Sequence, residues 1–149
     1  MDESSAAAPP LNPSPEAICD LLSRARTIAI VGLSNDRARA SHGIAQYLAR
    51  QGYEVIPVNP TIESWKEIPS RRSLRDVTEK VDIVDVFRRP DAIPEIVEDA
   101  IAIGAPVLWL QPGAENDAAA ARAAAAGITV ISGPCIFQEH MRCSVHARR

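Results

Sequence analysis

Residues 27–60 read TIAIVGLSNDRARASHGIAQYLARQGYEVIPVNP, and they contain the clearest indication of the fold. It opens with a short apolar run at 27–31, passes through a polar loop that contains glycine, and closes with a second apolar run at 54–58. Both runs are nearly continuous in apolar residues rather than alternating, which is typical of strands covered on both faces. Between them, Ile44 and Leu48 mark one face of a helix. The stretch therefore predicts a strand, a helix and a second, parallel strand.

The same pattern continues to the end of the chain. Further apolar runs occupy 83–87, 107–110 and 128–131, with helical stretches between them. Three helical stretches end on a glycine just before a strand, and these glycines are Gly52, Gly104 and Gly127. Glycine takes the left-handed conformation that ends a helix, and parallel strands joined by helices make right-handed crossovers. The sequence predicts an α/β fold, a Rossmann-like doubly wound parallel five-stranded sheet with strand order 3-2-1-4-5 and helices on both faces.

The domain boundaries follow from the composition of the two ends. Residues 1–13 are rich in Ala, Pro and Ser, which predicts a disordered tail. Ser14 is followed by proline, a pair typical of a helix start, so the folded domain is predicted to span 14–143. Residues 144–149 are predicted to form a loose tail. Within the domain, 61–80 has the weakest pattern and predicts a loop with a short helix.

The overall composition excludes several classes of protein. The chain has 149 residues, of which 46% are hydrophobic, and a formal net charge of -3. These values suit one globular domain and give no basic field for nucleic acid. No apolar run approaches the roughly 18 residues of a membrane span, and the acidic start Met1-Asp2-Glu3 lacks the features of a signal peptide. We therefore predict a cytoplasmic protein with neither membrane nor nucleic acid as a partner.

The three cysteines are Cys19, Cys135 and Cys143. An odd number in a chain with ample apolar residues predicts a reducing compartment and no structural disulfide. Four zinc-capable side chains, Cys135, His140, Cys143 and His146, follow one another near the end, but their spacing is not typical of zinc sites, so no metal site is predicted. Cys135 follows the fifth strand at the crevice end of the sheet and is either a buried inert residue or a thiol that exchanges with a ligand.

The loop after the first strand is the best candidate for a ligand site. Gly32 lets the backbone approach a phosphate, Ser34 adds a hydroxyl, and Arg37 and Arg39 add positive charge. Ser41 has the residue type of a helix N-cap. The alternative is a solvated turn with unpaired arginines. Ligands of doubly wound sheets bind beyond the carboxyl ends of the strands where the strand order reverses, which favours a phosphate site here.

Two features argue against an ordinary dinucleotide site. The loop does not match G-x-G-x-x-G, and Asn59 stands where a carboxylate would bind the ribose hydroxyls of NAD. At the end of the third strand, Phe87 could flank an adenine and Arg88 could reach a phosphate, or Phe87 belongs to the core and Arg88 to the solvated surface. Gln111, after the fourth strand, offers an amide at the mouth of the crevice.

Six short segments carry a resemblance to a known family. They are IVGLS, RAS, VIPVNP, VDIVDVFRRP, WLQPG and CI, at residues 30–34, 39–41, 55–60, 81–90, 109–113 and 135–136. Their order and spacing resemble the small stand-alone CoA-binding proteins, which are related to the N-terminal domain of the succinyl-CoA synthetase alpha subunit. The resemblance covers about residues 14–143. It implies a Rossmann-like domain that binds coenzyme A as its cofactor.

The resemblance also implies which residues contact coenzyme A. Four groups follow from the match to the family: Gly32, Leu33, Ser34 and Arg39 at the phosphate end, with Ser41 at the following helix start; Val58, Asn59 and Pro60 on one wall; Val86, Phe87 and Arg88 on another wall near the adenine; and Gln111 near the pantetheine arm. One departure is Ala40, where the family often has proline. The synthetase also needs a second domain with a phosphorylated histidine, so ligase activity is not implied.

The sequence leaves three functions open. The first is a cytoplasmic module that binds coenzyme A or an acyl-CoA, because no paired acid, base or nucleophile stands beside the loop and no catalytic residue is predicted. The second is an NAD(P)-binding oxidoreductase whose arginine-rich loop receives a 2′-phosphate. The third is a redox-linked regulator in which Cys135 exchanges with a CoA disulfide. A homodimer through the Ala-rich stretch 118–126 is a further expectation.

Overall fold

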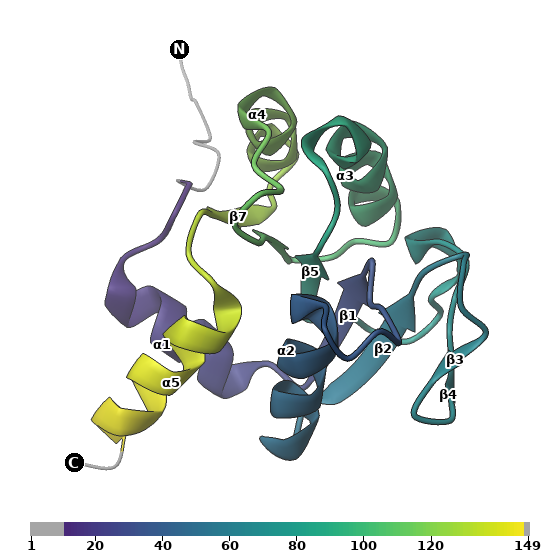
Figure 1. The fold of residues 1–149 in the computed structure, drawn as a ribbon. Coiled ribbons are helices and arrows are strands. Elements are labelled where there is room, and N and C mark those ends of the chain that lie inside the picture. Colours follow the sequence, from purple (N-terminus) through teal and green to yellow (C-terminus); the bar gives the residue numbers. More distant parts are fainter. Residues whose placement is uncertain (1–10, 148–149) are drawn as a thin grey trace.

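The computed structural model describes residues 11–147, in which helices and strands alternate around one central sheet (Figure 1). In chain order the elements are α1 (Pro15–Arg24), β1 (Thr27–Val31), α2 (Ala40–Arg50), β2 (Glu54–Val58), β3 (Ser64–Trp65), β4 (Ile68–Pro69), η1 (Leu74–Asp76), β5 (Ile83–Val86), η2 (Pro90–Ala92), α3 (Ile93–Ala102), β6 (Val107–Leu110), α4 (Asp117–Ala125), β7 (Thr129–Ser132) and α5 (Ile136–Ala147). None of the helices within this described part is both long and apolar enough to cross a membrane.

The sheet confirms the predicted fold class. Its five strands are all parallel and lie in the order β2-β1-β5-β6-β7. The end of β1 lies between two neighbouring strands, because Val31 is opposite Val58 of β2 on one side and Val86 of β5 on the other. The five apolar runs coincide with these strands to within one residue. The fold is therefore a Rossmann-like, doubly wound α/β domain.

Counted along the sequence, the five strands lie in the order 2-1-3-4-5, and the sheet is consistent with a 3-2-1-4-5 pattern when a bridge at the outer edge of β2 is counted as the third strand. There Arg71 makes an isolated parallel bridge to Val58 and occupies the third position. The Arg71 N–H donates to the Pro57 carbonyl oxygen at 2.9 Å. The strand at 83–87, which the predicted order placed at the edge beside the second strand, lies instead between β1 and β6. Residues 61–80 contain no continuous apolar run, and accordingly the third position is reduced to a single bridge.

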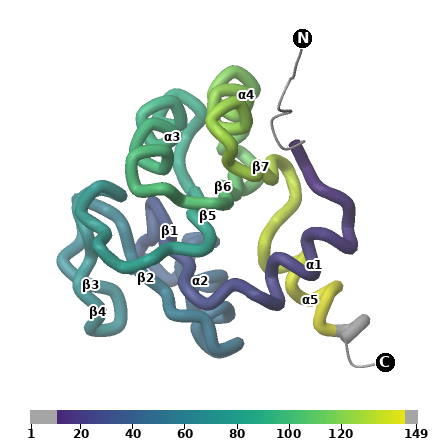
Figure 2. The backbone as a smooth tube through the Cα atoms, turned by 180° about the vertical axis from the view of Figure 1, so that it is seen from behind, coloured from purple at the N-terminus to yellow at the C-terminus, as the bar shows by residue number. Residues whose placement is uncertain are grey.

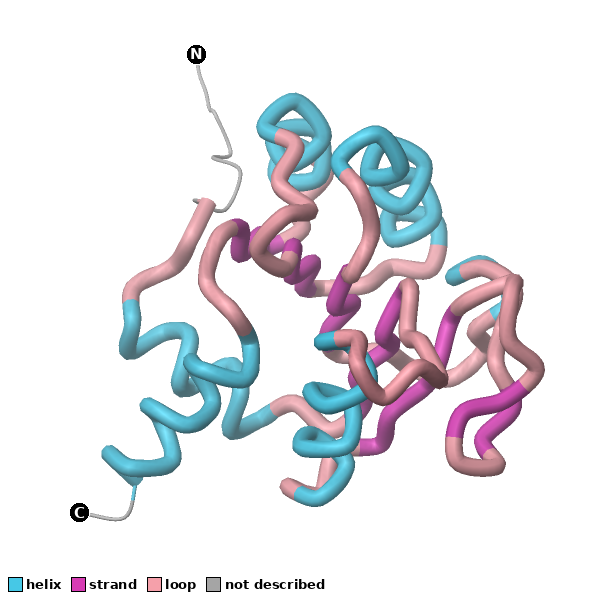
Figure 3. Tube along the Cα trace, in the orientation of Figure 1, coloured by secondary structure: helices cyan, strands magenta, loops and turns pink. Residues whose placement is uncertain are grey.

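Helices cover both faces of the sheet (Figure 3). On one face, α3 and α4 pack against the side chains of Ala29, Val84 and Leu108. On the other face, α1, α2 and α5 cover Ile30 and a second set that includes Ile28, Ile83, Trp109 and Ile131. Since each strand has side chains pointing to both layers, nearly every strand residue is buried, which explains the continuous apolar runs.

The stretch 61–80 forms more structure than the predicted loop. β3 and β4 make a two-residue hairpin whose turn residues, Lys66 and Glu67, have positive φ angles of 48° and 67°. The predicted short helix is confirmed as η1. Arg71 and Glu79 then form a bidentate ion pair, with both nitrogen–oxygen distances at 2.7 Å. The Arg71 guanidinium lowers the pKa of the Glu79 carboxyl to about 2.

The two ends of the described chain are tied to the body of the domain. Ser14 caps α1 as predicted, since its Oγ accepts the Ala17 N–H at 3.1 Å. Residues 1–10 of the predicted N-terminal tail lie outside the described residues. Asn12 binds the edge strand β7, because its N–H donates to the Val130 carbonyl and its Oδ1 accepts the Ser132 N–H. At the other end, α5 continues past the predicted boundary at residue 143.

The prediction that no structural disulfide exists is wrong. Cys19 of α1 and Cys143 of α5 form a disulfide, with their Cα atoms 5.3 Å apart. Both views of the backbone place α1 and α5 side by side (Figures 1 and 2). The two cysteines are 124 residues apart in sequence, so only the packing of two terminal helices on the same face of the sheet brings them together. Cys135 remains a free, half-buried thiol.

Candidate functional site

A crevice opens at the carboxyl ends of β1, β2 and β5. The chain leaves β1 toward α2 on one face of the sheet and leaves β5 toward α3 on the other face, so the two loops diverge. This is the position at which ligands of doubly wound sheets bind. A pocket of about 560 Å³ occupies the crevice, and it is lined by Gly32, Ser34, Asp36, Arg39, Ala40, Ser41, Asn59, Pro60, Thr61, Phe87 and Arg88.

Gly32 allows the loops after β1 and β5 to meet. Its φ angle is +88°, and a Cβ at this position would collide with the backbone carbonyl oxygen of Phe87. The Gly32 N–H donates to the Val58 carbonyl at 2.9 Å, which fixes the start of the loop against β2. A side chain would both strain the backbone and push the two loops apart. Glycine here is therefore a requirement of the crevice itself.

Side chains within the loop after β1 hold its shape. Ser41 Oγ accepts the Ser34 N–H at 3.0 Å, Ser34 Oγ accepts the Asp36 N–H at 3.0 Å, and the Asp36 carboxylate accepts the Ala38 N–H at 2.9 Å. The prediction that Ser41 caps the helix is wrong, because α2 begins one residue earlier, at Ala40. The Ser41 hydroxyl instead supports the loop.

The start of α2 is an electropositive point on the pocket wall. Arg39 occupies its N-cap position, and no side chain bonds to the first backbone N–H groups of this helix. Unpaired N–H groups at a helix start carry partial positive charge and attract anions. The exposed Arg39 and Arg88 side chains also line the pocket and make no hydrogen bond or ion pair within residues 11–147. The arrangement can bind a phosphate or diphosphate.

Asn59 connects the end of β2 to the loop. Its Nδ2 donates to the Leu33 carbonyl at 3.0 Å, and its Oδ1 accepts the Thr61 N–H at 2.9 Å and the Thr61 hydroxyl at 2.7 Å. Both ends of the amide are thus engaged within the protein. A ribose diol in a dinucleotide site is bound by a carboxylate at this position, which this residue does not supply.

Three predicted site residues lie under the crevice rather than on its wall. The side chains of Leu33, Val58 and Val86 belong to the buried core. Val58 lines a smaller cavity of about 210 Å³ together with Pro60 and Arg88, on the α3 side of the sheet. The backbone carbonyls of Leu33 and Val58 still shape the loop through the hydrogen bonds described above.

Gln111 supports the start of α5. Its side chain is buried, its Oε1 accepts the Ile136 N–H at 3.1 Å, and its Nε2 lies 3.5 Å from the Cys135 Sγ. The residue also lines a pocket of about 300 Å³ next to the crevice, which shares Phe87 and Arg88 with it. Gln111 is therefore close to the predicted position, but its amide is already bonded to the protein.

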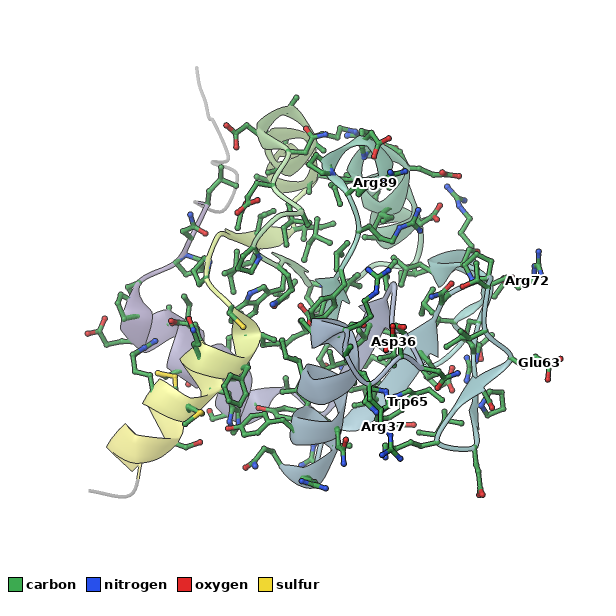
Figure 4. All side chains as sticks on the ribbon, viewed as in Figure 1. Asp36, Arg37, Glu63, Trp65, Arg72 and Arg89 are labelled. Carbon is green, nitrogen blue, oxygen red and sulfur yellow. A yellow bond between two sulfur atoms is a disulfide. The ribbon has the colours of Figure 1, made fainter. Side chains whose placement is uncertain are left out.

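A hairpin brace beside the loop was not anticipated from the sequence. Trp65 of β3 is buried, and its Nε1 lies 3.3 Å from His42 Nδ1, which in turn lies 3.1 Å from the Ser34 carbonyl oxygen. Asn35 also donates to the Ser64 carbonyl at 2.8 Å. Figure 4 shows Asp36, Arg37 and Trp65 grouped at the start of α2. Trp65 stands alone between Pro60 and Pro69, and this local pattern does not predict its contact with His42.

One buried acid lies outside the pocket. Asp85 of β5 is fully buried between Ile30 and Trp109 of the neighbouring strands, and neither carboxylate oxygen has a hydrogen-bond partner in the structure. Burial raises the pKa of this carboxyl well above its usual range. Asp85 thus belongs to the core beneath the sheet surface and does not line the crevice.

Two of the four residues considered for zinc, His140 and Cys143, are engaged elsewhere. The Cys143 sulfur belongs to the disulfide, and His140 Nδ1 lies 2.7 Å from the Tyr47 hydroxyl. Nothing is described of the His146 side chain. No group of three or more His, Cys, Asp or Glu side chains within the described part of the chain is arranged to hold a metal ion.

Comparison with known proteins identifies the family. Residues 26–141 match the model of the CoA binding domain. The uncharacterized protein YneT of Bacillus subtilis (strain 168) is 40% identical over 129 residues, which are 87% of this chain and 96% of YneT. A hypothetical protein from Pyrococcus horikoshii OT3 is 34% identical with a TM-score of 0.87, covering 97% of this chain and 99% of that chain.

A larger enzyme shares the fold. The dinucleotide-forming acetyl-coenzyme A synthetase 1 of Ca. Korarchaeum cryptofilum, in complex with phosphate and ADP, has a TM-score of 0.63 at 24% identity, over 70% of this chain and 25% of that chain. At this identity the likeness concerns the fold alone. The family match covers most of the chain, including every predicted site residue. The chain therefore belongs to the CoA-binding domain family.

Proposed function

We propose that the protein binds coenzyme A or an acyl-CoA in the crevice beyond β1, as a cytoplasmic binding module without chemistry of its own. The observation that carries the proposal is the pocket wall formed by Gly32, the uncapped start of α2 and the unpartnered Arg39 and Arg88. Backbone N–H groups and arginines together suit a diphosphate. Membership of the CoA-binding domain family supports the same ligand.

The parts of the ligand follow from the parts of the pocket. The diphosphate would lie against Ser34, Arg39 and the first turn of α2, where the positive charge is concentrated. The adenine end would lie between Pro60 and Phe87, which face the crevice from β2 and β5. The pantetheine arm would pass over Arg88 toward the adjoining pocket beside Gln111. In this arrangement Leu33, Val58 and Val86 would not contact the ligand with their side chains. Their backbone would shape the crevice, and their side chains would pack in the core beneath it.

The alternative ligand, NAD(P), is disfavoured by Asn59. A dinucleotide site needs an acceptor for the ribose hydroxyls, and both ends of the Asn59 amide are bonded within the protein. Calorimetric titration with coenzyme A, NAD and NADP separates the two functions. We expect coenzyme A to bind and both dinucleotides to bind at least about tenfold more weakly. Tighter binding of NADP than of coenzyme A would reverse the assignment.

Variants test the pocket wall. Arg39→Ala and Arg88→Ala should each weaken coenzyme A binding by about tenfold or more, because a charge-assisted hydrogen bond contributes about 1.5–3 kcal/mol. Arg50→Ala removes an arginine from the last turn of the same helix, away from the pocket, and serves as the matched control. If all three variants bind coenzyme A as the unmodified protein does, the ligand does not lie in this crevice.

A further inference from the structure

A second, larger groove lies at the opposite end of the sheet from the crevice. It encloses about 1170 Å³ and is formed where α1 ends, where β2 begins and where α5 packs beside them. Its lining includes Cys19, Ser23, Tyr53, His140 and Cys143. The groove belongs to the amino ends of the strands, so the ligand of the proposed function does not account for it.

The floor of this groove contains the disulfide. Both Cys19 and Cys143 line the groove, and both are half-buried rather than enclosed in the core. A disulfide exchanges with a thiol only when a sulfur can be reached by the attacking thiolate. His140 lines the same groove and precedes Cys143 by about one helical turn. The site therefore has access and a volume that suits a small molecule.

The disulfide is the strongest link between the second half of α5 and the domain. At the start of the helix, Ile136 is fully buried and its N–H donates to Gln111. Further along, the described side chains are half-buried or exposed. They contact the domain through the ring pairs Tyr47–Phe137 and Tyr53–His140, through the Tyr47–His140 hydrogen bond and through Arg142, which donates to the Pro15 carbonyl at 3.3 Å. None of the described side chains of α5 from Phe137 to Ser144 is fully buried, so this part of the helix should open at lower free-energy cost than the sheet once the covalent link is removed.

We propose that Cys19–Cys143 is a thiol-exchange site, at which a low-molecular-weight thiol enters the groove, reduces the disulfide and frees the second half of α5. The thiolate attacks one sulfur, forms a mixed disulfide and releases the other cysteine as a thiolate. A second small thiolate then attacks the small-molecule sulfur of the mixed disulfide, which forms the small-molecule disulfide and releases the remaining protein cysteine as a thiolate. Two small thiols are oxidised to their disulfide, and the protein disulfide gains two electrons and two protons to become two cysteine thiols.

Reduced glutathione is a suitable probe, because it tests the groove independently of coenzyme A binding. The Cys135→Ser variant, oxidised, is incubated with low-millimolar glutathione without denaturant, quenched with an alkylating agent and analysed by mass spectrometry. We expect a trapped glutathione adduct at Cys19 or Cys143, then alkylation of both, while the buried Trp65 and Trp109 retain native fluorescence. Hydrogen exchange should rise in the second half of α5 and remain slow in the sheet.

A groove-filling variant distinguishes entry through the groove from exchange after unfolding. Ser23→Trp places an indole in the groove and should slow reduction by about tenfold, since exchange rates depend on access to the sulfur. Gln138→Trp places the same side chain on an exposed position of α5 outside the groove and should leave the rate unchanged. Equal rates for all variants, or reduction only at denaturant concentrations that unfold the domain, would overturn the proposal.

Discussion

Removing the disulfide should cost the domain about 5 kcal/mol of unfolding free energy. The two cysteines are 124 residues apart, so the bond closes a loop that includes nearly all of the described chain. In the chain-entropy model, a loop of this length restricts the unfolded ensemble by about 5 kcal/mol at 25 °C. Domains of this kind have a total stability of about 5–15 kcal/mol, so the loss is a large share of it. The melting temperature should fall by about 10–20 °C.

Equilibrium unfolding in urea, followed by tryptophan fluorescence, measures this cost. Both Trp65 and Trp109 are almost completely buried, so their emission should report unfolding of the domain. The oxidised protein is compared with Cys143→Ser and with Cys135→Ser, the matched control that removes a thiol outside the disulfide. The dependence of the free energy on urea should also steepen in Cys143→Ser, because the uncrosslinked chain exposes more surface when unfolded. A loss of less than about 1 kcal/mol, or one equal to that of the control, would refute the reasoning.

Three further perturbations test other parts of the structure. Gly32→Ala should abolish coenzyme A binding in calorimetry and lower the free energy of unfolding in urea by about 1–3 kcal/mol, because the new Cβ would collide with the Phe87 carbonyl oxygen. Unaltered binding would contradict this prediction. Asp85 has a raised pKa in the folded state, so its contribution to stability is present below the pKa of the unfolded chain and is lost as the pH rises through the folded pKa. The melting temperature of Asp85→Asn should therefore rise relative to that of the unmodified protein as the pH is raised from acid to alkaline. A difference that does not change with pH would contradict the raised pKa of Asp85. Glu67→Gly should stabilise the domain by about 0.5–1 kcal/mol, since Glu67 has a left-handed backbone in the hairpin turn. If chemical denaturation shows no increase in the free energy of unfolding, the backbone of this turn is not strained.

The fold could be predicted from the sequence because its signals are local. Strands buried on both faces require continuous apolar runs, and glycines at helix ends require the left-handed conformation, so both features are visible in windows of a few residues. Gly52, Gly104 and Gly127 all have the positive φ angles that this reading requires. The position of the crevice loop followed from the same pattern, because the carboxyl end of the first parallel strand is defined as soon as the strand is recognised.

The roles of individual site residues could not be predicted in the same way. Ser41 has the residue type of a helix cap, but the loop before α2 leaves its hydroxyl nearer to the Ser34 N–H. Gln111 was expected at the mouth of a crevice, but the arrival of α5 from 25 residues later engages its amide. The brace from Trp65 to His42 likewise depends on a hairpin that the apolar pattern of 61–80 does not indicate.

Local sequence patterns were enough to predict the alternation of strands and helices, the parallel sheet and the loop that faces its carboxyl edge. The folded chain was needed to show that Arg71 bridges the edge of β2, that Leu33, Val58 and Val86 lie beneath the pocket, and that Cys19 bonds to Cys143. Backbone propensity and apolar periodicity act between residues a few positions apart. The contacts revealed by the folded chain depend instead on which helices share a face of the sheet and on how closely these helices pack. A short window of sequence does not contain this information.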